Sequence, residues 1–408
     1  MAERNLSPAA ADTIWKSAEE ALIAGDVRAL EDLLREHARL FSEGAPPAYN
    51  AGGLAPDYSA GDARSIIVRN HHFENWVEFA RYREALSDAD SPVARFETAV
   101  DAVVSGDVAA LERLLSDAPE LIHARSPRTH HSTLLNYVGA NGIEAHRQKT
   151  PTNAMTVAET LLAAGADVDA IGEMYGGTTT LGLVATSIHP LQAGVQPALI
   201  ELLLEHGAAI ERAVAPDYRA GNFVDACLAN GRPEAAEYLA RRGAPLSLAG
   251  AAGVGRLDIV EQFFDEAGGV KAPATPDQVS DAFDWACAHG RTNVVEFLLA
   301  HGVEPGTKLR AAGQTGLHAA AVGGRTDVVK LLLDRGVPVD PKDDTYQNTP
   351  LGWALHGYAT SPDSERERYH EVAKLLVSAG ASIDPGWSEW DAVAADPRML
   401  AVLRRESA

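Results

Sequence analysis

The chain has 408 residues, a formal net charge of −22 and a pI near 5.0. So acidic a chain argues against non-specific binding to nucleic acid or to an anionic membrane surface, because both need clustered lysine and arginine. Its two cysteines, Cys227 and Cys287, exclude a disulfide framework and favour a reducing cytoplasm.

The first 94 residues predict three successive segments. Residues 1–41 are expected to form a degenerate helix pair, and they lack the basic and apolar regions of a secretory signal. Residues 42–63 are rich in Gly, Pro and Ala, which is typical of a loop. Residues 64–94 predict an accessory helical segment. No uncharged apolar run anywhere approaches a membrane-spanning length.

From residue 95 to residue 386 the sequence repeats a unit of two short helices. Three first helices are expected to end at Gly290, Gly324 and Gly357, at steps of 34 and 33 residues (324 − 290 and 357 − 324). A Thr-Pro-Leu opening at 349–351 suits a first helical turn, and glycine suits the left-handed backbone at a helix end. Residues 387–408 are expected to be capping helices that present a polar outer face.

This pattern resembles the ankyrin repeat, whose signature is Thr-Pro-Leu-His-x-Ala at a period of about 33 residues. The resemblance is closest over residues 315–384. It implies an all-α ankyrin-repeat solenoid of about nine helix pairs, with degenerate terminal repeats and an irregular N-terminal segment. In this family His318 is expected to be structural, because the histidine of the signature bonds the adjacent loop.

The accessory segment carries a second resemblance. Arg69, His71, Phe73 and Trp76 are similar to a segment that precedes the repeats in many bacterial ankyrin-repeat proteins. His72 stands where glycine is usual, so the turn is expected to differ. The resemblance implies a bacterial, cytoplasmic protein and names no activity.

Aromatic residues recur at one position of the first helix, namely Tyr137, Trp285 and Trp353. In ankyrin proteins the wall of first helices and the loops before them usually make the contacts, and Trp and Tyr are strong interface anchors. His356 belongs to a polar row beside this column. The alternative is packing between repeats, since Ala319 alternates with the two tryptophans. The direction of the Trp353 ring separates the two interpretations.

Two loops combine acidic and aromatic residues just before a first helix. One carries Glu173 and Tyr175, and the other carries Asp343, Asp344 and Tyr346. Such groups suit a cationic or polyol ligand, or a peptide bearing Lys or Arg. The alternative is ordinary turn chemistry.

A polar, basic stretch at 125–149 contains His130 and Arg147 and is a candidate site for an anion or carboxylate. The adjacent His130 and His131 diverge in extended chain, which disfavours a shared metal. No Cys/His set has zinc spacing, and no local catalytic or nucleotide-binding motif occurs. We therefore expect no metal and no cofactor.

The leading interpretation is an interaction scaffold that binds a protein or peptide through its concave groove and loops. The alternative is an enzyme or small-molecule-binding protein with a polar pocket assembled across the middle repeats. Its polar groups would be His130, Arg147, Glu173, His189 and Asp344. A deep pocket with perturbed titratable groups favours the alternative, whereas an open surface favours the scaffold.

Overall fold

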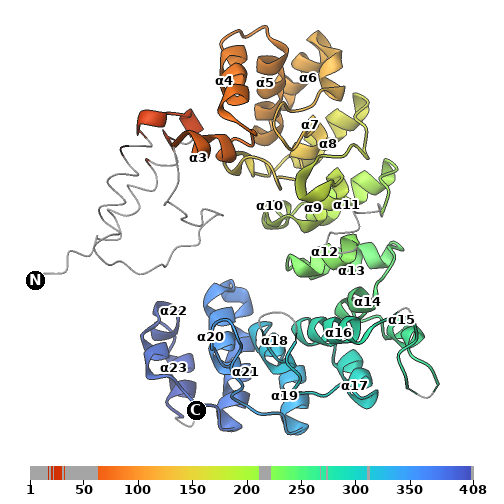
Figure 1. Cartoon of the computed structure of the whole chain (residues 1–408), viewed down its shortest axis with the longest axis vertical. Coiled ribbons are helices and arrows are strands. Elements are labelled where there is room, and N and C mark those ends of the chain that lie inside the picture. Colours follow the sequence, from red (N-terminus) through yellow and green to blue (C-terminus); the bar gives the residue numbers. More distant parts are fainter. Residues whose placement is uncertain are drawn as a thin grey trace, which may run out of the picture. The chain divides into compact units, whose positions relative to one another are not determined.

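The computed structural model describes residues 63–210, 222–266, 268–272, 274–309 and 313–405, together with 17, 20, 21, 23–29 and 32. The helix pair predicted at 1–41 and the loop predicted at 42–63 therefore lie largely outside the described residues. Within them the regular elements are helices, with three isolated β-bridges in loops. The predicted all-α class is confirmed. The chain divides into two compact units, one ending at Ala209 and the other running from Arg219 onward (Figure 1).

The first unit is a succession of helices in which short 3₁₀ turns (η) mark the loops. Its elements are α3 (Ala63–Asn70), α4 (Trp76–Leu86), α5 (Pro92–Ser105), α6 (Val108–Asp117), η1 (Pro119–His123), α7 (Leu134–Tyr137), η2 (Ala145–Arg147), α8 (Ala154–Ala163), η3 (Met174–Gly176), α9 (Thr180–Thr186), α10 (Ile188–Gln192) and α11 (Gln196–Glu205). Capping side chains explain where several of these helices begin. The side chains of Ser91, Thr133 and Thr179 each accept a hydrogen bond from a backbone N–H in the first turn of their helix.

The second unit continues with helix pairs. Its elements are α12 (Phe223–Ala229), α13 (Pro233–Arg241), α14 (Leu248–Val254), α15 (Leu257–Val260), η4 (Glu261–Phe263), α16 (Pro276–Ala288), α17 (Thr292–Ala300), α18 (Gly316–Val322), α19 (Thr326–Asp334), α20 (Pro350–Thr360), η5 (Asp363–Glu365), α21 (Glu367–Ser378), η6 (Pro385–Glu389), α22 (Asp391–Ala394) and α23 (Pro397–Leu403).

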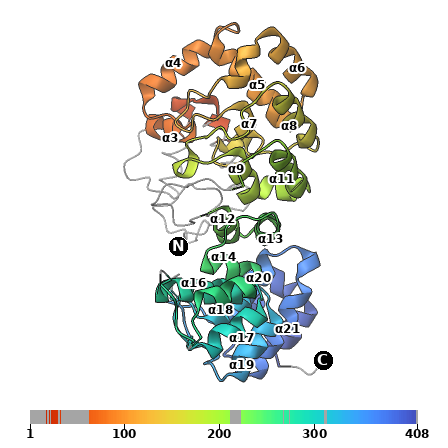
Figure 2. The same cartoon turned by 90° about the vertical axis from the view of Figure 1, so that its right-hand side faces the viewer.

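These pairs form two layers within the second unit. The first helices α14, α16, α18 and α20 contact one another in succession, and so do the second helices α17, α19 and α21 (Figures 1 and 2). The first helices approach closely because their facing residues are small. A Cβ on Gly316 would lie 2.7 Å from the Phe283 ring. Each second helix buries a leucine completely, namely Leu298, Leu332 and Leu376.

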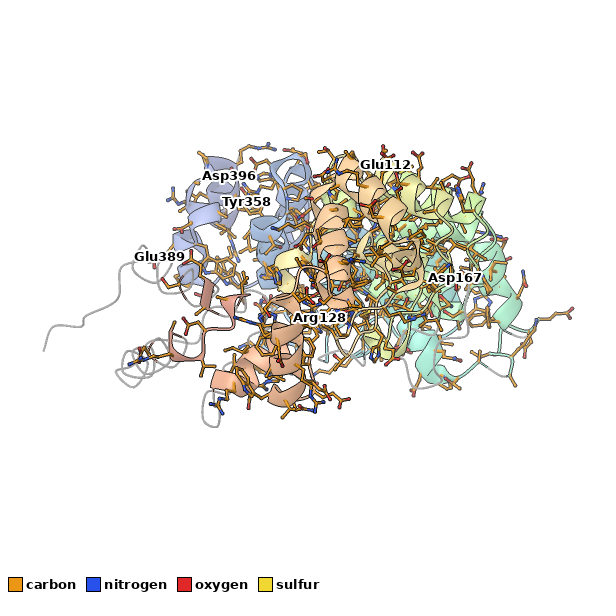
Figure 3. All side chains as sticks on the ribbon, turned by 90° about the horizontal axis from the view of Figure 1, so that it is seen from above. Glu112, Arg128, Asp167, Tyr358, Glu389 and Asp396 are labelled. Carbon is orange, nitrogen blue, oxygen red and sulfur yellow. The ribbon has the colours of Figure 1, made fainter. Side chains whose placement is uncertain are left out.

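His318 joins neighbouring repeats, as the resemblance implied. Its Nδ1 accepts a hydrogen bond from the Thr315 backbone N–H at 3.0 Å. Its Nε2 lies 3.2 Å from the carbonyl oxygen of Asn348 in the next loop. At the end of the array, the Tyr358 hydroxyl donates to Asp396 Oδ2 at 2.6 Å, which ties α20 to the start of α23 (Figure 3).

One predicted helix end is wrong. Gly290 and Gly324 do stand at helix ends with φ of 72° and 65°, but α20 runs through Gly357 to Thr360. A Cβ on Gly357 would lie 2.5 Å from the Val322 carbonyl oxygen and 2.6 Å from the Tyr369 ring. This glycine permits a close approach between repeats and does not terminate a helix.

Candidate functional site

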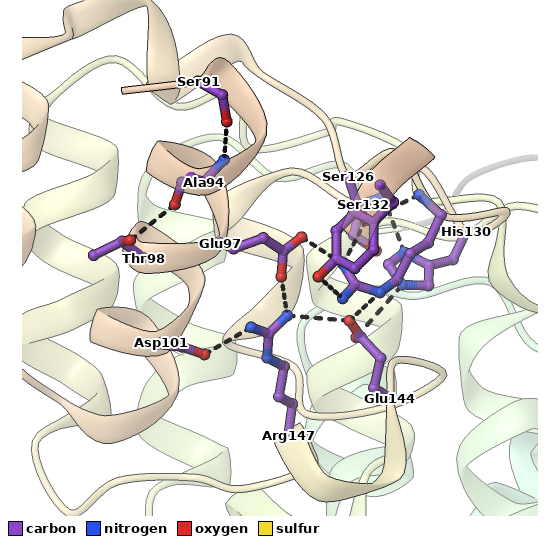
Figure 4. A network of polar contacts seen from close by, with 12 residues as sticks. Ser91, Ala94, Glu97, Thr98, Asp101, Ser126, His130, Ser132, Glu144 and Arg147 are labelled. Carbon is purple, nitrogen blue, oxygen red and sulfur yellow. Dashed lines mark hydrogen bonds and ion pairs between the residues drawn. The ribbon is translucent and has the colours of Figure 1, made fainter. Parts of the chain in front are cut away.

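Four charged side chains meet inside the first unit (Figure 4). Glu97 comes from α5, Arg128 from the loop before α7, and Glu144 and Arg147 from the η2 turn. Their exposed fractions are 4%, 2%, 0% and 8%, respectively. Arg128 lies 2.5 Å from an oxygen of each glutamate. Arg147 Nη1 lies 2.5 Å from Glu97 Oε2 and 3.1 Å from Glu144 Oε1. We call these four residues the buried charge network.

The surroundings of Glu144 and Arg128 favour the charged forms of these two side chains. Burial opposes the charge on Glu144, but His130, Arg128 and Arg147 together hold the pKa of its carboxyl well below the usual range. Burial likewise opposes the charge on Arg128, yet Glu144 and Glu97 raise its pKa. Each arginine of the network therefore contacts both glutamates inside the unit. Removing one partner would leave a buried charge uncompensated, which is strongly destabilising.

Two residues predicted for a polar pocket, His130 and Arg147, belong to this interior, where they contact carboxylates of the chain itself. Arg147 is a member of the network, and His130 is 3% exposed with its Nε2 3.6 Å from Glu144 Oε2. The Tyr82 hydroxyl accepts a hydrogen bond from Arg128 Nη2 at 2.7 Å. The network thus joins the accessory helix α4 to α5 and η2, and its polar groups hold the fold together.

For Tyr137 the structure agrees with the packing alternative. Its side chain is 1% exposed, and its ring centroid lies 6.4 Å from that of Phe96 and 5.9 Å from that of His130. In the first unit the loop before α7 and helix α5 cover this position of the first helix. Burial raises the pKa of the Tyr137 phenol far above its usual value, so it stays neutral.

The remaining predicted residues of the first unit lie apart from this interior. Glu173 is exposed, and its Oε1 lies 3.1 Å from His131 Nδ1. Tyr175 is 49% exposed, with a left-handed φ of 53°, and its hydroxyl donates to Asn141 Oδ1 at 2.8 Å. His189 is half-buried on α10. The five residues of the hypothetical pocket therefore divide between an interior network, a surface loop, α10 and, for Asp344, the second unit.

Asp343 organises the loop that precedes α20. Its side chain is completely buried, and its carboxylate accepts hydrogen bonds from the backbone N–H groups of Thr345, Tyr346 and Asn348 at 3.0, 2.6 and 3.0 Å. Burial opposes its charge, but these donors and the Trp353 indole hold the pKa of the carboxyl below its usual value. The prediction that Asp343 meets basic groups of a partner is therefore wrong, because its own loop occupies it.

Three aromatic side chains gather beside this loop, and we call them the aromatic cluster: Tyr346, Trp353 and His356. The Trp353 centroid lies 5.4 Å from that of Tyr346 and 5.4 Å from that of His356, with interplanar angles of 80° and 87°. Tyr346 is 67% exposed, His356 is exposed and Trp353 is half-buried. Trp353 Nε1 donates to Asp343 Oδ2 at 3.0 Å, which fixes the direction of the indole. The ring lies between the loop and the surface.

Asp344 lies in the same loop as Tyr346, whereas Trp285 lies further along the array on α16. Asp344 is exposed, and its Oδ1 forms an ion pair with Lys308 Nζ. Trp285 is half-buried on α16, two first helices away from Trp353. Between them on α18 stands Ala319, which is 3% exposed. The two tryptophans thus occupy the same helix position on either side of a small residue, in the order that the sequence predicts.

The sequence did not single out two carboxylates on α16, Asp281 and Asp284, which we call the acidic pair. Helical spacing of three and four residues puts them on the same side of the helix as Trp285. Burial, together with the nearby Asp281, raises the pKa of Asp284 to about 6. The spacing of these acids from a first-helix tryptophan would have been the signal.

Three further findings bear on the kind of site. Among the residues that the structure describes, no group of three or more His, Cys, Asp or Glu side chains is placed to hold a metal ion. None of the helices in that part of the chain is long and apolar enough to cross a bilayer. Burial raises the pKa of both thiols, that of Cys227 to about 12, so both are inert as nucleophiles.

Comparison with known proteins identifies the repeats. The family model for ankyrin repeats in three copies matches residues 283–386, which include the stretch where the sequence resemblance is closest. Among solved structures, the human ASB11 ankyrin repeat domain is 20% identical, with a TM-score of 0.34, and the match covers 70% of this chain and 99% of that one. No curated protein matches the chain. Residues 283–386 are ankyrin repeats, which generally serve as protein-interaction scaffolds.

Proposed function

We propose that this protein is an interaction scaffold and that its second unit binds a protein or peptide partner. The contact surface would consist of the loop before α20 and the exposed sides of α16, α18 and α20. The observation that carries the proposal is the aromatic cluster, in which Tyr346 is 67% exposed beside a Trp353 whose indole is fixed by Asp343. Exposed aromatic side chains held in one direction lose little entropy on binding and make good anchors.

The anchor residues extend along the array. Trp285 would provide a second contact on α16, and Asp344 would add a charge at the edge of the surface. In the first unit, the exposed Tyr175 and Glu173 offer a smaller surface of the same composition. We further propose a bacterial origin, on the resemblance of residues 69–76, and a cytoplasmic location, on the two buried, reduced cysteines.

The alternative, a small-molecule or catalytic pocket across the middle repeats, has less support. His130 and Arg147 are occupied by the buried charge network, and Asp344 is paired with Lys308 in the other unit. Glu173 pairs with His131 at the surface, and His189 lies on α10 outside the network. We therefore propose the interaction scaffold as the single function.

The test is capture of a partner by the full-length chain, followed by mass spectrometry. Tyr346→Ala is the informative variant, because an exposed ring can be removed without opening a cavity. Trp390→Ala, which removes another exposed ring (38%) near the C-terminus, is the matched control. Partners lost with the first variant and kept with the second support the proposal. Identical partner sets for wild type and Tyr346→Ala, with unchanged circular dichroism, would overturn it.

A further inference from the structure

Four histidine rings meet where the accessory segment, residues 64–94, packs against the repeats, and we call them the histidine junction: His71, His72, His130 and His146. His71 and His72 lie in the turn between α3 and α4, whereas His130 lies in the loop before α7 and His146 in the η2 turn. The ring centroids of His72 and His130 are 5.3 Å apart, and those of His71 and His146 are 6.4 Å apart. Each of these two pairs therefore spans the contact between the segment and the repeats.

The loop before α7 also holds the accessory segment through Arg128. The Arg128 guanidinium lies 5.8 Å from the Phe73 ring centroid and 4.8 Å from that of Tyr82, and its Nη2 donates to the Tyr82 hydroxyl. The backbone N–H of Thr129 donates to the His72 carbonyl oxygen at 2.7 Å. Residues 128–130 therefore contact both the turn before α4 and α4 itself.

The carboxylates that face the histidine junction are already in contact with arginines. Glu144 lies 3.6 Å from His130 Nε2, and it contacts both arginines of the buried charge network (Figure 4). Glu97 contacts the same two arginines, and the exposed Asp101 pairs with Arg147. A proton added to the junction therefore brings positive charge beside two arginines, and the carboxylates that could offset this charge are shared with those arginines.

Two histidines of the junction resist protonation in the folded chain. Burial, followed by the adjacent Arg147, lowers the pKa of His146 to about 4. Burial, followed by the facing His130, lowers the pKa of His72. Glu144 raises both pKa values, but the net direction is downward for both. The packed segment therefore favours the neutral form of these two rings.

The other neighbours of these two rings do not oppose this effect. Arg128 and His71 lower both pKa values further. Tyr137 faces His130 from α7, with 5.9 Å between the ring centroids, and its phenol is neutral. A histidine in solvent has a pKa near 6.5. Between pH 6.5 and 4 a released segment would bind more protons than the packed one, so the packed form loses stability as the pH falls through this range.

We infer that the accessory segment is an acid-sensitive switch, which packs on the repeats at neutral pH and is released when the histidine junction binds protons. Release would uncover Phe73 and Tyr82 on the segment and Arg128 on the repeats, all of which are buried when the segment is packed. The inference is independent of the proposed contact surface in the second unit, because every residue that carries it belongs to the first unit.

Hydrogen exchange of the full-length chain, read by mass spectrometry at pH 7 and pH 5, tests the switch. Protection factors, which correct for the effect of pH on the chemical exchange rate, are compared for α4 and for α11 of the same unit. A single histidine whose pKa is about 4 when packed and about 6.5 when released shifts the equilibrium about 20-fold over this interval. We expect the protection of α4 to fall about tenfold more than that of α11, because partial exposure of the rings weakens the effect.

Variants separate the junction from general denaturation by acid. His72→Asn combined with His146→Gln should remove the difference between α4 and α11, and asparagine suits the left-handed φ of 57° at position 72. The matched control is His123→Gln, which removes an exposed histidine at the end of η1 and should keep the difference. Circular dichroism at pH 7 checks that each variant is folded.

Two results would overturn the inference. One is a wild-type chain in which the protection of α4 falls no more than that of α11, because acid would then act on the whole unit or on neither helix. The other is a difference between α4 and α11 that persists in the His72→Asn, His146→Gln variant. The first result needs no variant, so it decides the matter even where the double substitution prevents folding.

Discussion

Trp353 Nε1 donates a hydrogen bond to Asp343 Oδ2 at 3.0 Å, which links the middle of α20 to the loop that precedes it. The aspartate is completely buried, while the tryptophan is half-exposed and contacts Tyr346 and His356. The hydrogen bond therefore lets one ring serve two purposes. Its indole N–H stabilises the loop, and its ring supports an exposed aromatic cluster. Packing and recognition, which the sequence presents as alternatives, are combined in this side chain.

The substitution Asp343→Ala tests whether this carboxylate stabilises the loop before α20. We expect it to lower the free energy of unfolding by about 2–3 kcal/mol, because a charge-assisted acceptor of several N–H groups is lost. Urea unfolding followed by circular dichroism measures the change. Asp344→Ala, one residue further along, should cost less than about 1 kcal/mol, because its ion pair with Lys308 is exposed. Equal effects of the two substitutions would refute the role given to Asp343.

Trp353→Phe tests the coupling between the two residues. Phenylalanine keeps an aromatic ring but has no N–H, so the variant should lose about 1 kcal/mol. Combined with Asp343→Ala, it should cost clearly less than the sum of the single effects, since both remove the same bond. Additive free energies in this double-mutant cycle would show that the bond contributes nothing to stability.

Local patterns predicted most of the fold. The Thr-Pro-Leu opening places the start of α20, where Thr349 caps the helix and Pro350 occupies its first turn. The alternation of Trp285, Ala319 and Trp353 follows from the same register. The continuation of α20 through Gly357 was not predictable. This glycine is required by the nearby Tyr369 ring, which leaves no room for a Cβ. The sequence does not distinguish a glycine that ends a helix from a glycine that allows another segment to pack closely against the helix.

The candidate site was less predictable, because a polar residue that is a binding candidate at the surface has a structural role when it is buried. Glu97 and Arg147 are 50 residues apart in the chain and pair only in the fold. One local signal existed, since Glu97 lies three and seven residues before the buried Val100 and Val104 of α5, on the apolar side of that helix. Asp343 gave no such signal. An aspartate that points into its own turn and one that points to solvent have the same sequence context.

The buried charge network should respond strongly to the loss of one member. We expect Glu144→Gln to destabilise the first unit by about 3–5 kcal/mol, because it leaves two arginines facing a single buried carboxylate. Hydrogen exchange of α5 and α7, read by mass spectrometry, reports on this unit separately from the second. Asp101→Asn is the control, since Asp101 also pairs with Arg147 but its side chain is 67% exposed. Its effect should stay below about 1 kcal/mol.

The histidines beside the network predict a loss of stability in weak acid. Burial, followed by the nearby Arg147, lowers the pKa of His146 to about 4, from 6.5 in the unfolded chain. Glu144 raises this pKa, while His71 and Arg128 lower it further. Between pH 6.5 and 4 the unfolded chain binds more protons, so the stability of the first unit falls as the pH falls through this window.

The expected loss is about 1 kcal/mol, since the partial exposure of His146 screens the effect. His146→Gln should flatten the dependence between pH 6.5 and 4, measured as urea midpoints at several pH values. A further loss below that window belongs to carboxylates such as Glu144, so only the upper window is diagnostic. An unchanged slope in His146→Gln would assign the pH dependence to other groups.

The acidic pair predicts the opposite sign in the second unit. The pKa of Asp284 is raised to about 6 by burial and by Asp281, above the value near 4 of an unfolded chain. The folded state therefore binds more protons between pH 4 and 6, and its stability falls as the pH rises through that range. Asp284→Asn removes this cost and should raise the free energy of unfolding by about 1–2 kcal/mol at pH 7.5, with little effect at pH 4. An Asp284→Asn variant that is less stable than wild type at pH 7.5 would mean that the carboxylate is compensated within the fold.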